Sequence, residues 1–166
     1  LSWRPREQEM NRRQKRFRVD ARTIIQLCRE SIKYHITALL ELVKNSYDAD
    51  ASSVEIEIRS GEADSYIRVT DDGIGMDERE LEERWLRIGY SAKRSRPTTG
   101  RERRATGEKG IGRLSADRLG SSLEIRTKKS NSRAAGLAVD WSRFEVSGTN
   151  LEDVPIDVVE GEPPRL

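Results

Sequence analysis

The sequence predicts an α+β fold, in which helices are combined with pairs of short strands. Apolar residues recur at helical spacing from Ile24 to Val43, which is typical of an amphipathic helix. Apolar and polar residues then alternate over 54–58, and a turn separates this run from a second apolar run over 66–70. That pattern indicates a β-hairpin. With 166 residues, the chain is long enough for one domain with a buried core.

Caps, glycines and alternation place the remaining elements. Asp20 is a good N-cap for the first helix, which we expect to break once near residues 31–35. Because Pro155 cannot donate a backbone hydrogen bond, a strand around it can lie only at a sheet edge. Further helices are expected over 78–86 (capped by Asp77) and 113–119, and further strands over 122–127, 135–140 and 154–159.

Charge is distributed unevenly along the chain. The net charge is only +2, but residues 1–18 hold seven Lys or Arg against two acidic residues, and residues 93–118 hold nine against three. Residues 19–92 hold nine against sixteen. We therefore expect a basic N-terminal arm over 1–19, followed by a folded domain over 20–166. The arm fits two alternatives, a solvated surface and a contact with nucleic acid or a protein partner.

The single cysteine, Cys28, excludes an internal disulfide and favours a reducing compartment such as the cytoplasm. Its apolar neighbours indicate core packing rather than reactivity. No apolar run approaches the roughly 20 residues of a membrane span, so we expect no membrane association. The first residue is Leu1 and not Met, which suggests a fragment or a processed protein. The last residues resemble the start of a loop, so we expect the domain to continue past Leu166.

One stretch of the first helical region carries polar groups on an apolar background. Glu41, Asn45 and Asp48 are spaced i, i+4 and i+7, so they project from one face of a helix. Apolar residues surround them, and a carboxylate beside a carboxamide is costly there unless a polar partner fills the gap. A hydrated divalent cation with phosphates is one candidate for that partner. We expect this face to be half-buried.

Two glycine-rich stretches follow. The run DDGIGM over 71–76 comes directly after the second predicted strand. Its glycines permit close approach of a ligand to the backbone, and Asp71 can accept a hydrogen bond. The segment 89–112 ends in further glycines before a predicted helix, an arrangement that favours an anion. Taken alone, this second stretch is better explained as an ordinary loop.

Three pieces in order, ELVKNSYDADA, DDGIGMD and GEKGIGR, resemble the three nucleotide-binding boxes of the GHKL superfamily. That superfamily comprises gyrase-type topoisomerases, ninety-kilodalton heat-shock chaperones, histidine kinases and MutL-type mismatch-repair ATPases. The resemblance spans about residues 20–140. It implies a Bergerat-type fold, a two-layer α/β sandwich in which helices cover one face of a mixed, mostly antiparallel sheet. It also implies ATP and Mg²⁺ as ligands.

The resemblance implies a role for each polar residue of the first box. Glu41 matches the general base that orients and deprotonates the attacking water, and Asn45 matches the side chain that coordinates Mg²⁺. Asp48 would support this cluster or form a hydrogen bond with the nucleotide or its waters. Histidine kinases typically lack a glutamate at the position of Glu41, so its presence favours hydrolysis.

The second and third boxes would hold the two ends of the nucleotide. Asp71 matches the carboxylate that accepts a hydrogen bond from the adenine amino group. Gly75 and Met76 would let the ring approach and then cover it. A phosphate-binding lid would span 89–112. Its expected contacts with the nucleotide are Ser91, Lys93, Gly107, Lys109, Gly110, Ile111 and Gly112.

Other charged residues near these boxes have simpler interpretations. Asp50 and Asp72 are expected to be solvated loop acids. The lone histidine, His35, is expected to lie at the surface or to be satisfied by neighbours rather than to be catalytic. Three lid arginines are expected to be mobile surface groups rather than phosphate ligands: Arg101, Arg103 and Arg104.

Among the GHKL branches, the resemblance favours the N-terminal ATPase domain of a heat-shock-protein-90-like chaperone, which would hydrolyse Mg-ATP slowly. Lid closure would be coupled to association with a partner, including nucleotide-dependent dimerisation of the full-length protein. Two alternatives stay open. One is a MutL- or MORC-like DNA-associated ATPase. The other is a nucleotide-gated binding module without turnover, whose basic arm and lid contact nucleic acid or a protein client.

Overall fold

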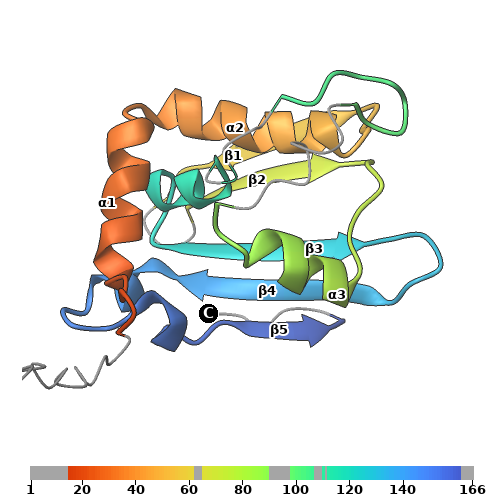
Figure 1. Ribbon diagram of the computed structural model, residues 1–166. Helices are drawn as coiled ribbons and strands as arrows, with labels where there is room; N and C mark the ends of the chain where they lie inside the picture. Colours follow the sequence, from red (N-terminus) through yellow and green to blue (C-terminus); the bar gives the residue numbers. More distant parts are fainter. Residues whose placement is uncertain (1–14, 62–64, 90–97, 107–109, 111, 162–166) are drawn as a thin grey trace, which may run out of the picture.

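Helices cover one face of the strands in this protein (Figure 1). The structure is a computed structural model. All pairings among the described strands are antiparallel. This arrangement confirms the predicted two-layer α+β sandwich. The described residues are 15–61, 65–89, 98–106, 110 and 112–161.

The first two helices are α1 (Ala21–Ser31) and α2 (His35–Asp48). Asp20 caps α1, because its Oδ1 accepts a hydrogen bond from the Arg22 amide at 3.0 Å. Between the helices Ile32 adopts an extended backbone and buries its side chain, which is 7% exposed. The predicted cap and the predicted break are both confirmed.

The hairpin that follows consists of β1 (Val54–Arg59) and β2 (Tyr66–Asp71). Val54 pairs with Asp71 in its register. The last residue of β2 therefore lies beside the first residue of β1. Because β1 follows α2 after a short connection, this register brings the Asp71 carboxylate close to the end of α2.

The second sheet has the order β3-β4-β5, with β3 (Ser122–Lys128), β4 (Ala134–Asp140) and β5 (Asp157–Glu160). The middle strand, β4, is buried without interruption from 135 to 139. Among the described strands β5 pairs only with β4, and it begins two residues after Pro155. The prediction of an edge strand near this proline is confirmed.

The predicted helix after the DDGIGM run begins as α3 (Glu78–Glu80). Asp77 accepts a hydrogen bond from the Glu80 amide at 2.9 Å, and the Glu80 carboxylate accepts one from the Asp77 amide at 3.3 Å, which forms a capping box. The helix continues to Trp85 as a wider π-helical turn that buries Leu81 completely. In Figure 1, α3 lies in front of β3 and β4.

The helix predicted over 113–119 is the 3-10 helix η3 (Gly112–Arg118), which buries three consecutive residues at 114–116. Arg118 joins the end of η3 to the end of α1. The Arg118 guanidinium donates hydrogen bonds to the carbonyls of Ile32 at 3.2 Å and Arg29 at 2.7 Å. These bonds satisfy carbonyls at the end of α1 that have no partner within the helix.

The hydrophobic core lies between α1, η3 and β4. Cys28 belongs to it and is 3% exposed, so the expectation of a packed rather than reactive cysteine agrees with the structure. Burial, with a smaller contribution from the Asp117 carboxylate, raises the pKa of the Cys28 thiol to about 11. The described part of the chain contains no helix long and apolar enough to cross a membrane. The buried cluster consists of Ala21, Ile25, Cys28, Leu81, Leu114, Ala116, Ala135, Leu137, Val139, Trp141 and Phe144.

Candidate functional site

The polar face of α2 is formed as its spacing predicts. Asp48 is half-buried and the Glu41 side chain is 23% exposed, whereas Asn45 is exposed. The expectation of a half-buried face therefore holds for the two carboxylates and is wrong for Asn45. Ser46, on another side of the helix, is buried. This orientation leaves the carboxamide of Asn45 accessible to a ligand.

Glu41 lies between its own helix and the start of η3. Lys44 donates a hydrogen bond to Glu41 Oε1 at 2.7 Å. The other oxygen, Oε2, faces Gly112, and a Cβ added to that glycine would lie only 2.6 Å from it. The contact brings residues of the first and third boxes together. A side chain at position 112 would displace the carboxylate.

Asp71 is held by two hydrogen bonds. Its Oδ2 accepts one from the Ser46 hydroxyl at 2.9 Å, and its Oδ1 accepts one from the Gly73 amide at 2.9 Å. Ser46 is only 4% exposed, and its hydroxyl also lies 3.4 Å from the Leu42 carbonyl oxygen. Sequence reasoning missed Ser46. The signal available was a small polar residue on the otherwise apolar side of a predicted helix.

The glycines of the second box allow close backbone packing. A Cβ on Gly73 would lie 2.7 Å from the Ala49 carbonyl oxygen, which also accepts a hydrogen bond from the Ile74 amide at 2.8 Å. This run therefore docks directly on the end of α2.

Gly75 has a φ of +63°, and an added Cβ would overlap the carbonyl of Lys128. The Met76 amide donates a hydrogen bond to Thr127 Oγ1 at 2.8 Å, and the Met76 side chain packs against the core. These contacts attach the run to the end of β3. That Gly75 and Met76 also contact an adenine ring stays a prediction.

The lid is described in part. Thr106 donates to Asp48 through its amide at 2.9 Å and through its hydroxyl at 3.1 Å. Gly110 has a φ of +70°, and its carbonyl accepts a hydrogen bond from the Gly89 amide at 3.3 Å. Five of the predicted nucleotide contacts lie outside the described residues: Ser91, Lys93, Gly107, Lys109 and Ile111.

Two acids near the end of α2 differ from each other in exposure. Asp72 is exposed, and its Oδ1 accepts hydrogen bonds from the amides of Ser53 at 2.8 Å and Ser52 at 2.6 Å, which lower the pKa of Asp72. Asp50 is only 7% exposed. The expectation that Asp50 is a solvated loop acid is therefore wrong, because the segment 98–104 folds over it.

Two arginines of the described lid segment have side-chain partners within the protein. Arg101 Nη1 donates to Ser52 Oγ at 2.6 Å. Arg103 Nη1 donates to the Ala51 carbonyl at 2.7 Å, and its guanidinium lies 5.1 Å from the centre of the Tyr47 ring. Arg101 and Arg104 are exposed, as expected of surface groups. The expectation is wrong for Arg103, which is half-buried against the chain around the end of α2.

These residues suit ATP with Mg²⁺. No group of three His, Cys, Asp or Glu side chains among the described residues could hold a metal ion unaided. Mg²⁺ commonly takes only one or two protein oxygens and completes its shell with phosphates and waters. A single exposed carboxamide, Asn45, beside the half-buried carboxylates of Glu41 and Asp48 is compatible with that requirement. We therefore find that the donor set fits the ligand that the resemblance implies.

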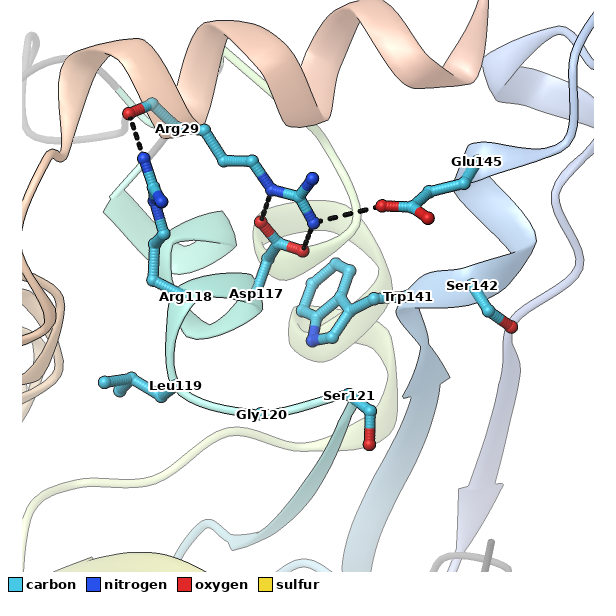
Figure 2. Close-up of a pocket in the computed structure, with 9 residues that line it drawn as sticks. All are labelled: Arg29, Asp117, Arg118, Leu119, Gly120, Ser121, Trp141, Ser142 and Glu145. Atoms are coloured by element: carbon cyan, nitrogen blue, oxygen red, sulfur yellow. Dashed lines mark hydrogen bonds and ion pairs between the residues drawn. The ribbon is translucent and has the colours of Figure 1, made fainter.

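A pocket of about 440 Å³ lies elsewhere in the molecule, between α1, the end of η3 and the start of the segment after β4 (Figure 2). Figure 2 shows Arg29 reaching Asp117 in two hydrogen bonds of 2.7 and 2.8 Å and Glu145 at 3.1 Å. None of the predicted site residues lines it. Arg29 is paired with Asp117 and Glu145, and Arg118 bonds to backbone carbonyls of Arg29 and Ile32, which indicates a structural junction.

Residues 33–162 match the family described as "Histidine kinase-, DNA gyrase B-, and HSP90-like ATPase". The chain belongs to this ATPase family. The match covers all three boxes and the strands β1 to β5, so the predicted superfamily is confirmed.

Curated relatives of this ATPase domain include proteins that act on DNA according to their names. The chain is 37% identical over 90 residues to the putative type II restriction enzyme HgiDII of Herpetosiphon aurantiacus. The matched residues make up 54% of this chain and 14% of that protein. It is 61% identical over 36 residues to the DNA mismatch repair protein MutL of Fervidobacterium nodosum, covering 22% of the chain and 6% of that protein.

A second mismatch repair protein MutL, from Endomicrobium trichonymphae, is 45% identical over 62 residues, covering 37% of the chain and 10% of that protein. The chain therefore spans a small fraction of the length of the relatives it matches. The similarity to MutL supports the MutL-like alternative at least as well as the chaperone-like branch.

Proposed function

We propose that this ATPase domain binds Mg-ATP and hydrolyses it as part of a DNA-associated protein. The observation that carries the proposal is the contact between Glu41 and Gly112. It brings the carboxylate expected to act as the base against the box expected to hold the phosphates. An attacking water would then be held between the base and the terminal phosphate.

Asp71 would select adenine by accepting a hydrogen bond from its amino group. Ser46 and Gly73 each donate one hydrogen bond to a different oxygen of Asp71. A carboxylate has about four acceptor sites. These two bonds therefore fix the plane of the Asp71 carboxylate and leave acceptor sites for the adenine amino group. The carboxylate is therefore oriented before the nucleotide arrives.

Glu41 would take the proton from the attacking water. Lys44 bonds to Oε1, so we assign the proton to Oε2, the oxygen that faces Gly112. Asn45 would hold Mg²⁺, which when bound neutralises phosphate charge. Asp48, one turn beyond Asn45, would support this cluster or form a hydrogen bond with the nucleotide or its waters.

The DNA-associated branch is favoured over the chaperone-like branch by the names of the relatives. Several similar proteins are named DNA mismatch repair protein MutL, and one is named a putative type II restriction enzyme. The excess of Lys and Arg over residues 1–18 and 93–118 would favour binding to a polyanion. Dimerisation of the full-length protein on binding ATP is part of the same proposal.

Replacing Glu41 by Ala in the full-length protein tests the enzymatic part. We expect the rate of phosphate release to fall about 100-fold or more, which is typical of losing a general base. ATP binding measured by calorimetry should persist, because Asn45 and Asp71 remain. Glu55→Ala, at an exposed glutamate of β1, is the matched control. An unchanged rate in Glu41→Ala would instead support a binding module without turnover.

The effect of DNA on the full-length protein tests the branch. We expect duplex DNA to change the rate of ATP hydrolysis, and the affinity for DNA to fall steeply as salt is raised. A rate that responds to an unfolded protein client but not to DNA would contradict the DNA-associated branch and favour the chaperone-like one.

A further inference from the structure

The described lid segment, 98–106, is fastened to the chain around the end of α2 at several points. Thr106 bonds to Asp48, Arg101 bonds to Ser52, and Arg103 bonds to the Ala51 carbonyl. Thr98 and Arg104 are bridged, so the segment itself closes into a turn. At the centre of these contacts lies Asp50, an acid that the proposed mechanism does not use.

Asp50 is held in an unusual state. Its side chain is 7% exposed, although aspartate is rarely buried without strong compensation. Its φ is 60°, in the left-handed region that glycine occupies more easily. Both features are unfavourable, and such residues persist where the surrounding structure fixes them.

The compensation comes from the lid segment. The Arg101 amide donates a hydrogen bond to Asp50 Oδ2 at 3.2 Å, and a Cβ on Gly100 would lie 3.0 Å from the same oxygen. The Thr99 hydroxyl, followed by the amides of Arg101 and Gly100 and the charge of Arg103, lowers the pKa of Asp50. The carboxylate is thus charged and enclosed by the turn. Its Oδ1 is buried and accepts no hydrogen bond from the described residues.

We propose that Asp50 is a positioning residue that anchors segment 98–106 on the end of α2. The anchor holds Thr106 against Asp48, one of the residues expected to support the nucleotide. The nucleotide-binding part of this inference depends on the proposed function, whereas the anchoring part does not. An anchored segment is ordered before ATP binds, so less conformational entropy is lost when it does.

Replacing Asp50 by Gly separates anchoring from folding. Glycine adopts a positive φ without strain, so the backbone at this position is relieved while the carboxylate is lost. Asp50→Asn is the conservative variant, because asparagine tolerates the same conformation and keeps an acceptor oxygen. Glu102→Gly is the matched control. Glu102 has a φ of 61° in the same segment and an exposed side chain, with no side-chain bond to α2 among the described residues.

Two measurements on the full-length protein are needed: amide hydrogen exchange of residues 98–106, and the Kd of a non-hydrolysable ATP analogue. In Asp50→Gly we expect exchange of the segment to become faster and the Kd to rise roughly tenfold, while the melting temperature does not fall. We expect Asp50→Asn and Glu102→Gly to stay within about twofold of the wild type in Kd.

Several outcomes would overturn the inference. These are unchanged exchange in Asp50→Gly, an equal effect in Glu102→Gly, or a Kd that falls because the segment obstructs the site. If the wild type does not bind the analogue, the proposed function fails, and exchange alone still decides the anchor. If Asp50→Gly does not fold, Gly100→Val tests the same contact from the lid side. Gly100→Val should then make amide exchange of residues 98–106 faster. Unchanged exchange in this variant would overturn the proposal that Asp50 anchors the segment.

Discussion

The contact between Gly112 and Glu41 predicts a specific effect of adding one methyl group. An alanine Cβ at position 112 would lie 2.6 Å from Glu41 Oε2, about 0.8 Å short of the 3.4 Å at which ordinary contact begins. The carboxylate has to move by roughly that amount. Since a misplacement of about 1 Å at a reacting group can cost about 100-fold in rate, we expect Gly112→Ala to lower kcat by roughly 10- to 100-fold.

The assay is steady-state phosphate release by the full-length protein, with the Kd of a non-hydrolysable ATP analogue measured alongside. Gly120→Ala is the matched control, because its Cβ would meet its nearest atom, the Ser122 carbonyl oxygen, at an ordinary 3.5 Å. Glu41→Asp shortens the side chain, so Gly112→Ala should cost much less in that background. An unchanged kcat in Gly112→Ala, or the same loss in both backgrounds, would refute the reasoning.

Two further predictions concern buried groups. Ser46→Ala removes the donor to Asp71 Oδ2, so calorimetry should show ATP bound roughly 5- to 20-fold more weakly with kcat nearly unchanged; an unchanged Kd would contradict the orienting role. The raised pKa of Cys28, about 11 against an ordinary value of 9.0, stabilises the fold at pH below about 9. That stabilisation should be lost progressively between pH 9 and 11, because only the unfolded state releases the proton there. Denaturant titrations of wild type and Cys28→Ala should converge over this range, and parallel curves would contradict the assignment.

Most elements of the fold could be predicted from the sequence because their signals are local. The cap at Asp20, the alternation over 54–58 and the position of Pro155 each act within a few residues, and each prediction agrees with the structure. Helix geometry was less predictable. The helix after Asp77 widens into a π-helical turn and η3 is a 3-10 helix, because packing of Leu81 and residues 114–116 in the core competes with local preference.

The geometry of the candidate site was predictable where side chains share one helix face and less so where contacts join distant segments. Glu41, Asn45 and Asp48 follow from their spacing. Ser46 acts on Asp71, a residue 25 positions away, and nothing local marks that partnership. Asp50 was misjudged for the same reason. Its burial is caused by a segment about 50 residues downstream, which a pattern of neighbouring residues cannot reveal.

The two ends of the candidate site are fixed by one helix, and this limits what ligand it can take. Glu41 contacts the third box and Ser46 contacts Asp71 of the second box. The two residues are five positions apart on α2, which corresponds to about 7.5 Å along a helix axis. A rigid α2 therefore sets the separation between the base and the adenine acceptor. A ligand that uses both must bring its ring to Asp71 and its reacting phosphate to Glu41.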